Sequence, residues 1–216
     1  MLANKQTPED VLFIIATGNR TEDKSGANRI TSKLANRTRR FDFQENLDDL
    51  TAYALDSGWK TDLIQFLRFR PGLISDFDAN RFANPTPRSW ERVSLVPDSL
   101  DASLFLENVI GEVGEGAAAE YVGFRRIYSQ LPNIDALLLD PKGAQVPTDP
   151  AVRYAITGAL ARKATVDNID RIMAYTSRLP AEFAVMTIKD SIKLAPKITS
   201  TRAFIEWSTA NAEVLM

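Results

Sequence analysis

Neither cysteine nor histidine occurs among the 216 residues of the sequence. Without cysteine there is no disulfide framework and no thiol nucleophile, and without histidine there is no Ser-His-Asp triad and no ordinary zinc site. The side chains left for chemistry are carboxylates, Lys, Arg, Asn, Ser, Thr and Tyr. This set suits the handling of phosphate groups, and it equally suits a protein with no catalytic role.

A large excess of charge is also missing, because 26 basic residues face 28 acidic ones and the net charge is -2. The overall charge of the protein therefore does not favour binding to nucleic acid or to an anionic membrane. A local basic patch is still compatible with these numbers. No apolar run approaches the length of a membrane span, and the opening residues MLANKQTPED are too polar for a secretory signal. We therefore expect a cytoplasmic protein with neither a membrane nor a nucleic acid as partner.

The stretch VLFIIATGNRTEDKSG resembles the start of a nucleotide-binding fold, with an apolar strand leading to a glycine. Gly18, Lys24 and Ser25 fall in the register of a P-loop, but Asp23 replaces its second glycine. A P-loop wraps backbone N–H groups around phosphate oxygens, which requires glycine's freedom and no nearby negative charge. A complete phosphotransferase built on Lys24 and Ser25 is therefore the least favoured interpretation.

The rest of the chain indicates helices rather than strands. Residues 11–16 are a β-branched apolar run typical of a buried strand, and residues 40–43 alternate like a second short one. Two strands cannot make a covered sheet, so we expect this opening segment to be the end of a larger domain whose first part is missing. The predicted helices are 46–57, 61–70, one beginning at Pro87, 100–110, 117–131, 150–164, 166–179, 181–194 and 201–212.

Two motifs that suggest chemistry have structural explanations. GEVGEG, residues 111–116, follows a helical pattern where a dinucleotide fingerprint requires a strand, so we predict a turn between closely packed helices. The acidic pair Asp48 and Asp49 falls in the first turn of a predicted helix, where carboxylates are favoured in any case.

Four segments in order give the sequence a family resemblance: ATGNR, SKLANRTRRFDF, RFANPTPRSWERVS and GEVGEGAAAEYVGF. Together they resemble the second half of a MoxR-like AAA+ ATPase of the bacterial and phage type. Walker A and Walker B, which come earlier in that family, have no match. The resemblance implies a mainly α chain in which the C-terminal end of an AAA+ α/β core (1–45) is followed by a helical lid (46–115) and a helical extension (116–216).

The resemblance assigns two polar side chains of the opening segment to catalysis. Asn19 matches sensor 1, a neutral amide that orients water near the γ-phosphate, although asparagine is also common as a plain turn residue. Arg37 matches the arginine finger that neutralises charge on a phosphoryl group in a neighbouring subunit. The family's Arg-Phe pair is broken here by Thr38, so Arg39 and Arg40 are alternative fingers.

Arg88, in PTPRSW, resembles sensor 2, which reaches from a lid helix to the nucleotide phosphates. A cation in the first turn of a helix is mildly disfavoured by the helix dipole, which hints at a role. The alternative is an exposed arginine paired with Glu91 or Glu112.

In this family, ring oligomers, usually hexamers, bind ATP and Mg between subunits and remodel partner proteins or assist metal insertion in a chaperone-like way. The resemblance therefore implies ATP and Mg as cofactors, held through an N-terminal half, and a protein substrate or metal-binding partner. We expect no metal site in the chain and no ATP hydrolysis by the chain alone. The alternative function is a non-catalytic helical module that binds another protein.

Overall fold

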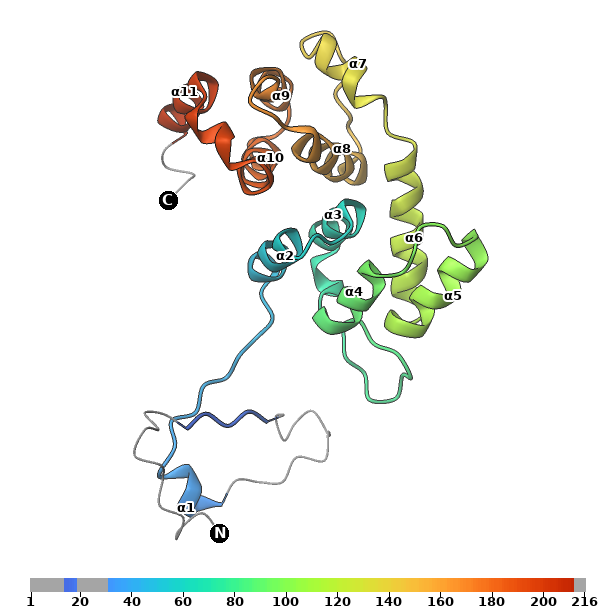
Figure 1. Cartoon of the computed structure of the whole chain (residues 1–216). Helices are drawn as coiled ribbons and strands as arrows, with labels where there is room; N and C mark the ends of the chain where they lie inside the picture. Colours follow the sequence, from blue (N-terminus) through green and yellow to red (C-terminus); the bar gives the residue numbers. More distant parts are fainter. Residues whose placement is uncertain (1–13, 19–30, 212–216) are drawn as a thin grey trace. The chain divides into compact units, whose positions relative to one another are not determined.

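The computed structural model describes residues 14–18 and 31–211, and the chain divides into two units, Met1–Phe43 and Gln44–Met216. The division falls close to the domain boundary predicted after residue 45. In the first unit, the described residues contain one short helix, α1 (Ser32–Ala35), and otherwise irregular backbone (Figure 1). In the described residues of the second unit, every regular element is a helix.

The two predicted strands are not formed in the described residues. Ile14 and Ile15 are 78% and 86% exposed and pair with no other strand, whereas residues 11–13 of the predicted strand lie outside the described part. Residues 40–43 are also irregular and exposed. A strand needs a ladder partner for its backbone groups, and the described residues offer none.

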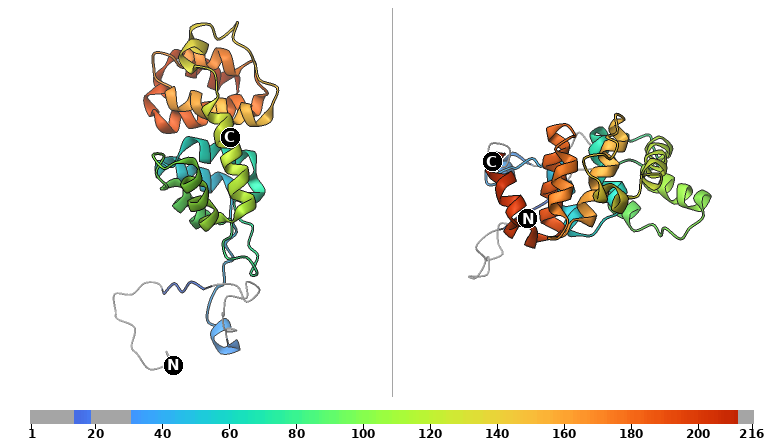
Figure 2. Two further views of the ribbon diagram at one scale, coloured as in Figure 1. Left: turned by 90° about the vertical axis from the view of Figure 1, so that its right-hand side faces the viewer. Right: turned by 90° about the horizontal axis from the view of Figure 1, so that it is seen from above.

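The second unit consists of two groups of helices in chain order, and the prediction of a mainly α chain is confirmed. The first group is α2 (Leu47–Asp56), α3 (Thr61–Phe69), the 3-10 turn η2 (Pro71–Leu73), α4 (Pro87–Ser94), α5 (Ala102–Val113) and α6 (Glu115–Ser129). The second group is α7 (Ile134–Leu139), α8 (Pro150–Lys163), α9 (Ile169–Thr176), α10 (Ala181–Leu194), η3 (Pro196–Ser200) and α11 (Arg202–Ala210). Figure 2 shows the two groups stacked, with α6 running from the first group toward the second.

Side-chain caps start six of the α-helices in the described residues, namely α2, α4, α5, α7, α8 and α11. The Asn46 side chain accepts hydrogen bonds from the backbone N–H groups of Asp48 and Asp49, and Gly58, with φ 69°, follows the end of α2. The predicted helix 166–179 is shorter than expected, because the Asn168 side chain bonds the backbone of Lys163 and Thr165 and starts α9 only at Ile169. The short helix α7 was not predicted.

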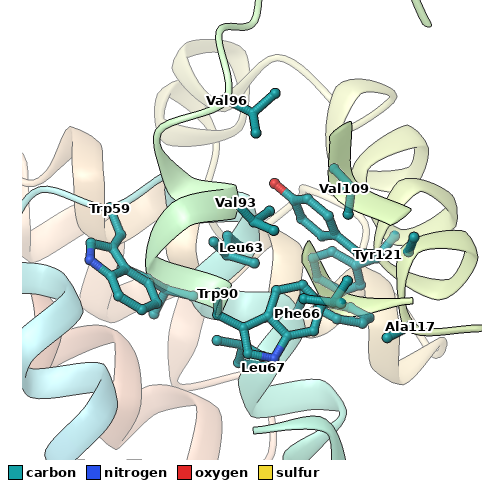
Figure 3. Close-up of a cluster of buried hydrophobic side chains, with 14 of the residues drawn as sticks. Trp59, Leu63, Phe66, Leu67, Trp90, Val93, Val96, Val109, Ala117 and Tyr121 are labelled. Atoms are coloured by element: carbon teal, nitrogen blue, oxygen red, sulfur yellow. The ribbon is translucent and has the colours of Figure 1, made fainter. Parts of the chain in front are cut away.

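Aromatic rings that meet edge-on or at an angle fill the core of the first group (Figure 3). The Phe66 ring lies 5.6 Å from that of Trp90, 5.4 Å from that of Tyr121 and 5.8 Å from that of Phe124, centroid to centroid. These four side chains are at most 3% exposed. The core therefore joins α3, α4 and α6, and it holds the beginning of α4 in a fixed place.

The second group has its own core, and α8 and α10 connect it to the first. On α8, Tyr154 packs against Phe69 of the first group and Phe183 of the second, with ring centroids 5.9 and 5.0 Å apart. The largely buried guanidinium of Arg68, on α3, makes a two-pronged ion pair with the buried carboxylate of Asp190, on α10, at 2.5 and 2.8 Å. The predicted domain boundary after residue 115 falls in the first turn of α6, which packs against α3, α5 and α8.

Candidate functional site

Arg88 lies in the first turn of α4, in a setting built by a reciprocal cap. The Thr86 hydroxyl accepts a hydrogen bond from the Ser89 N–H at 3.1 Å, and the Ser89 hydroxyl accepts one from the Thr86 N–H at 2.8 Å. Trp90, the next residue along, is fully buried. The predicted helix start at Pro87 is confirmed, and the backbone on both sides of Arg88 is anchored.

The acidic residues expected to pair with Arg88 are engaged elsewhere. Glu91 accepts a hydrogen bond from the Tyr53 hydroxyl at 2.6 Å, and Glu112 pairs with Arg92 at 2.5 Å. Within residues 14–18 and 31–211, no hydrogen bond or ion pair engages the Arg88 side chain, which is exposed. The ion-pair explanation of Arg88 is therefore wrong for the described part of the chain.

The other residues assigned by resemblance belong to the first unit. Asn19 lies outside the described residues, as do Lys24 and Ser25. Arg37 follows α1 and is exposed, and so is Arg39. Arg40 pairs with Asp42 at 2.8 Å, so among the three finger candidates it is the one with an ion pair in the part described. Arg37 belongs to the first unit and Arg88 to the second.

A charged cluster that the sequence analysis missed joins α3 to α6. The buried carboxylate of Asp62 accepts a hydrogen bond from the Tyr121 hydroxyl at 3.1 Å and lies 3.5 Å from the Arg125 guanidinium. Arg125 and Lys60 both pair with Asp98 at 2.6 Å. The helical period of TDLIQFL places Asp62 near the buried face of α3. This position is the one sequence signal that could have predicted a buried carboxylate there.

Burial and neighbouring charges shift several pKa values in this cluster. Burial raises the pKa of Asp62 above its ordinary 3.8, against the opposing effect of Arg125. Partial burial also tends to raise the pKa of Asp98. The hydrogen bond and charge of Lys60, together with Arg125, outweigh this effect and lower the pKa of Asp98. Burial also raises the pKa of the Tyr121 hydroxyl well above 10.0, so it stays a hydrogen-bond donor.

These charges support the fold rather than a reaction. Each member of the cluster has its partner within it, and it contributes by fixing α3, α6 and the segment before α5 relative to one another. Arg88 differs, because its guanidinium has no partner in the described residues. A planar cation of this kind can bind phosphate or carboxylate oxygens with two parallel hydrogen bonds.

In comparisons with known proteins, no family model, curated protein or solved structure matches this chain. Among the described residues, no group of three or more acidic side chains could hold a metal ion, and no helix is long and apolar enough to cross a bilayer.

Proposed function

We propose that this chain is the sensor and lid portion of a MoxR-like AAA+ ATPase and works in the cytoplasm. The observation that carries the proposal is the guanidinium of Arg88 at the capped start of α4, which has no partner in the part of the chain described, with Glu91 and Glu112 both held by other residues. An arginine kept free on a rigid helix start suits a contact to nucleotide phosphates.

Each residue of the proposed site has one role. Arg88 contacts the phosphates from the lid, Asn19 orients the attacking water, and Arg37 reaches the nucleotide of a neighbouring subunit. Bound Mg-ATP supplies the phosphoryl group to be transferred, and a chain segment with Walker A and Walker B would hold it. The assembly would be a ring of such chains, usually a hexamer, that remodels a protein substrate or serves a metal-binding partner.

The test measures phosphate release from ATP with Mg by this chain alone and after adding a chain with the Walker A and Walker B half of a MoxR-like ATPase. We expect turnover only in the mixture. Arg88→Ala and Arg37→Ala should each lower it by about a hundredfold, because each removes one charge that stabilises the transferring phosphoryl group. Arg126→Ala is the matched control, since Arg126, on α6 in the predicted helical extension, is another exposed arginine without an ion pair in the described residues.

The outcomes separate the alternatives. Turnover in the mixture that survives both Arg88→Ala and Arg37→Ala would contradict the assigned roles. Turnover by the chain alone would revive the P-loop interpretation of Lys24 and Ser25. No turnover in either arrangement would favour the non-catalytic helical module.

A further inference from the structure

The glycines of GEVGEG, between α5 and α6, do not all serve the fold. Gly114 has φ 82°, and a Cβ atom on it would lie 3.1 Å from the Ala83 carbonyl oxygen, so the turn and the close approach both require glycine. Gly111 and Gly116 are exposed, and a Cβ atom on either would meet nothing within 4 Å. Because both lie within helices, where glycine is less favourable than alanine, internal packing does not explain them.

Both of these glycines line a groove of about 620 Å³ between the α5–α6 junction and the loop that precedes α4. The groove has apolar lining from Leu73, Pro85, Ile110, Val113 and Ala117. Phe82, also in the lining, is fully exposed to solvent. A groove with an apolar lining, two positions without side chains and an exposed aromatic ring has the features of a peptide-binding surface.

The loop that carries Phe82, which precedes α4 (Figure 1), is held by its own hydrogen bonds. Where the two ends of the loop meet, the Asp76 N–H donates to the Pro85 carbonyl at 3.0 Å. The Arg81 side chain also pairs with that of Asp76 at 2.8 Å. The aromatic ring is therefore displayed on a preorganised support. Preorganisation lowers the entropy cost of binding, and exposed aromatic anchors dominate many interfaces.

The charged side chains that line the groove indicate the charge of a partner that it can bind. Its lining carries three carboxylates, of Asp76, Glu115 and Glu120, and the single guanidinium of Arg81. Asp76 is neutralised by Arg81, and Glu120 pairs with Arg70 at 2.5 Å. In the part of the chain that the structure describes, Glu115 has no ion pair. An occupant with positive side chains complements this surface.

We propose that this groove binds an extended segment of a partner protein in which basic and aliphatic side chains alternate. The backbone of that segment passes over Gly111 and Gly116, where any side chain of this protein would stand in its way. Aliphatic side chains enter the apolar lining beside Phe82, and a Lys or Arg side chain meets Glu115. This binding requires no nucleotide, so it stands independently of the proposed ATPase role.

The experiment measures fluorescence anisotropy of a short labelled peptide with alternating Lys and Leu, titrated with the full chain. Comparison peptides replace Lys by Glu or Leu by Ser. We expect saturable binding of the Lys–Leu peptide, and binding weaker by at least about tenfold for each comparison peptide. The double variant Gly111→Leu/Gly116→Leu fills the groove and should weaken binding by about tenfold or more, while its thermal midpoint does not fall.

Gly123→Leu is the matched control, because Gly123 is an exposed glycine of α6 with open space around it that does not line the groove. It should bind the peptide as the wild type does. Equal binding by the wild type and the double variant, or no binding of the Lys–Leu peptide at all, would overturn the proposal. A wild-type dimer in sedimentation that the double variant abolishes would identify the occupant as a second copy and overturn the assignment to a partner protein.

Discussion

Asp62 and Asp98 show how two carboxylates with a shared partner, Arg125, respond oppositely to pH. Burial raises the pKa of Asp62 above 3.8, so the folded state binds its proton more tightly than the unfolded chain does. The stability that this provides is fully present below about pH 3.8 and is lost as pH rises through the raised pKa. Asp98, whose pKa is lowered, contributes stability above about pH 3.8 that is lost as pH falls through its lowered value.

Replacing Asp62 by Asn should therefore change the pH dependence of stability in a defined direction. The amide can still accept the Tyr121 hydrogen bond but does not ionise. We expect the free energy of unfolding of Asp62→Asn to rise relative to the wild type as pH increases above about 3.8. Urea unfolding at a series of pH values measures this difference. Asp98→Asn is the control. Its free energy of unfolding should fall below that of the wild type as pH rises from the lowered pKa of Asp98 toward 3.8. A difference that is the same at every pH would contradict the assignment to Asp62.

At the scale of single elements, the cap of α4 links local sequence to the proposed site. Thr86 and Ser89 satisfy each other's backbone N–H groups, and the Ser89 hydroxyl also donates to the Asn84 carbonyl at 2.8 Å. This arrangement fixes the helix start that carries Arg88. The proposed phosphate contact therefore depends on the cap as well as on the arginine.

Thr86→Ala removes the hydroxyl that caps α4. We expect it to lower the free energy of unfolding by about 1 kcal/mol, since this is the typical loss for a removed N-cap side chain. Thr86→Ser keeps the hydroxyl and should stay close to the wild type. Chemical denaturation followed by circular dichroism checks both variants, and equal losses in the two would show that the methyl group rather than the cap matters.

For the second unit as a whole, the contact between its two helix groups depends on a buried ion pair. The side chains of Arg68 and Asp190 are 13% and 6% exposed, and they join α3 to α10 across 122 positions of sequence. Gly158, on α8, lies so close to α3 that a Cβ atom would stand 2.4 Å from Cγ of Gln65. Close backbone approach and a paired charge therefore hold the two cores together.

Asp190→Ala leaves the Arg68 guanidinium buried without its partner. We expect a loss of about 3 kcal/mol in the free energy of unfolding, because breaking a buried pair is costly even where the pair itself adds little net stability. The double variant Arg68→Leu/Asp190→Leu should recover most of that loss. Urea denaturation of both variants provides the test, and a double variant as unstable as Asp190→Ala would argue that the charges themselves are required.

The sequence predicted much of the helical fold because its signals are local. Caps such as Asn46 and Thr86 and the glycine at 114 mark helix ends through contacts within a few residues, so most predicted helices are confirmed. In the described residues the predicted strands are not formed, because a strand depends on a partner elsewhere in the chain. Of the candidate site, the position of Arg88 in the first turn of α4 was predicted, whereas its lack of an acidic partner among the described residues was not.

The sequence by itself determined that the chain is mainly helical, that cysteine and histidine chemistry are excluded, and where α4 begins. Only the tertiary structure decided that Tyr53 and Arg92 hold the acids near Arg88, that Asp62 is buried with Tyr121, and that Arg68 meets Asp190. Helix starts follow from neighbouring residues. The pairing of charges depends on which distant residues the packed helices bring within hydrogen-bond distance, and periodicity along the chain does not contain that information.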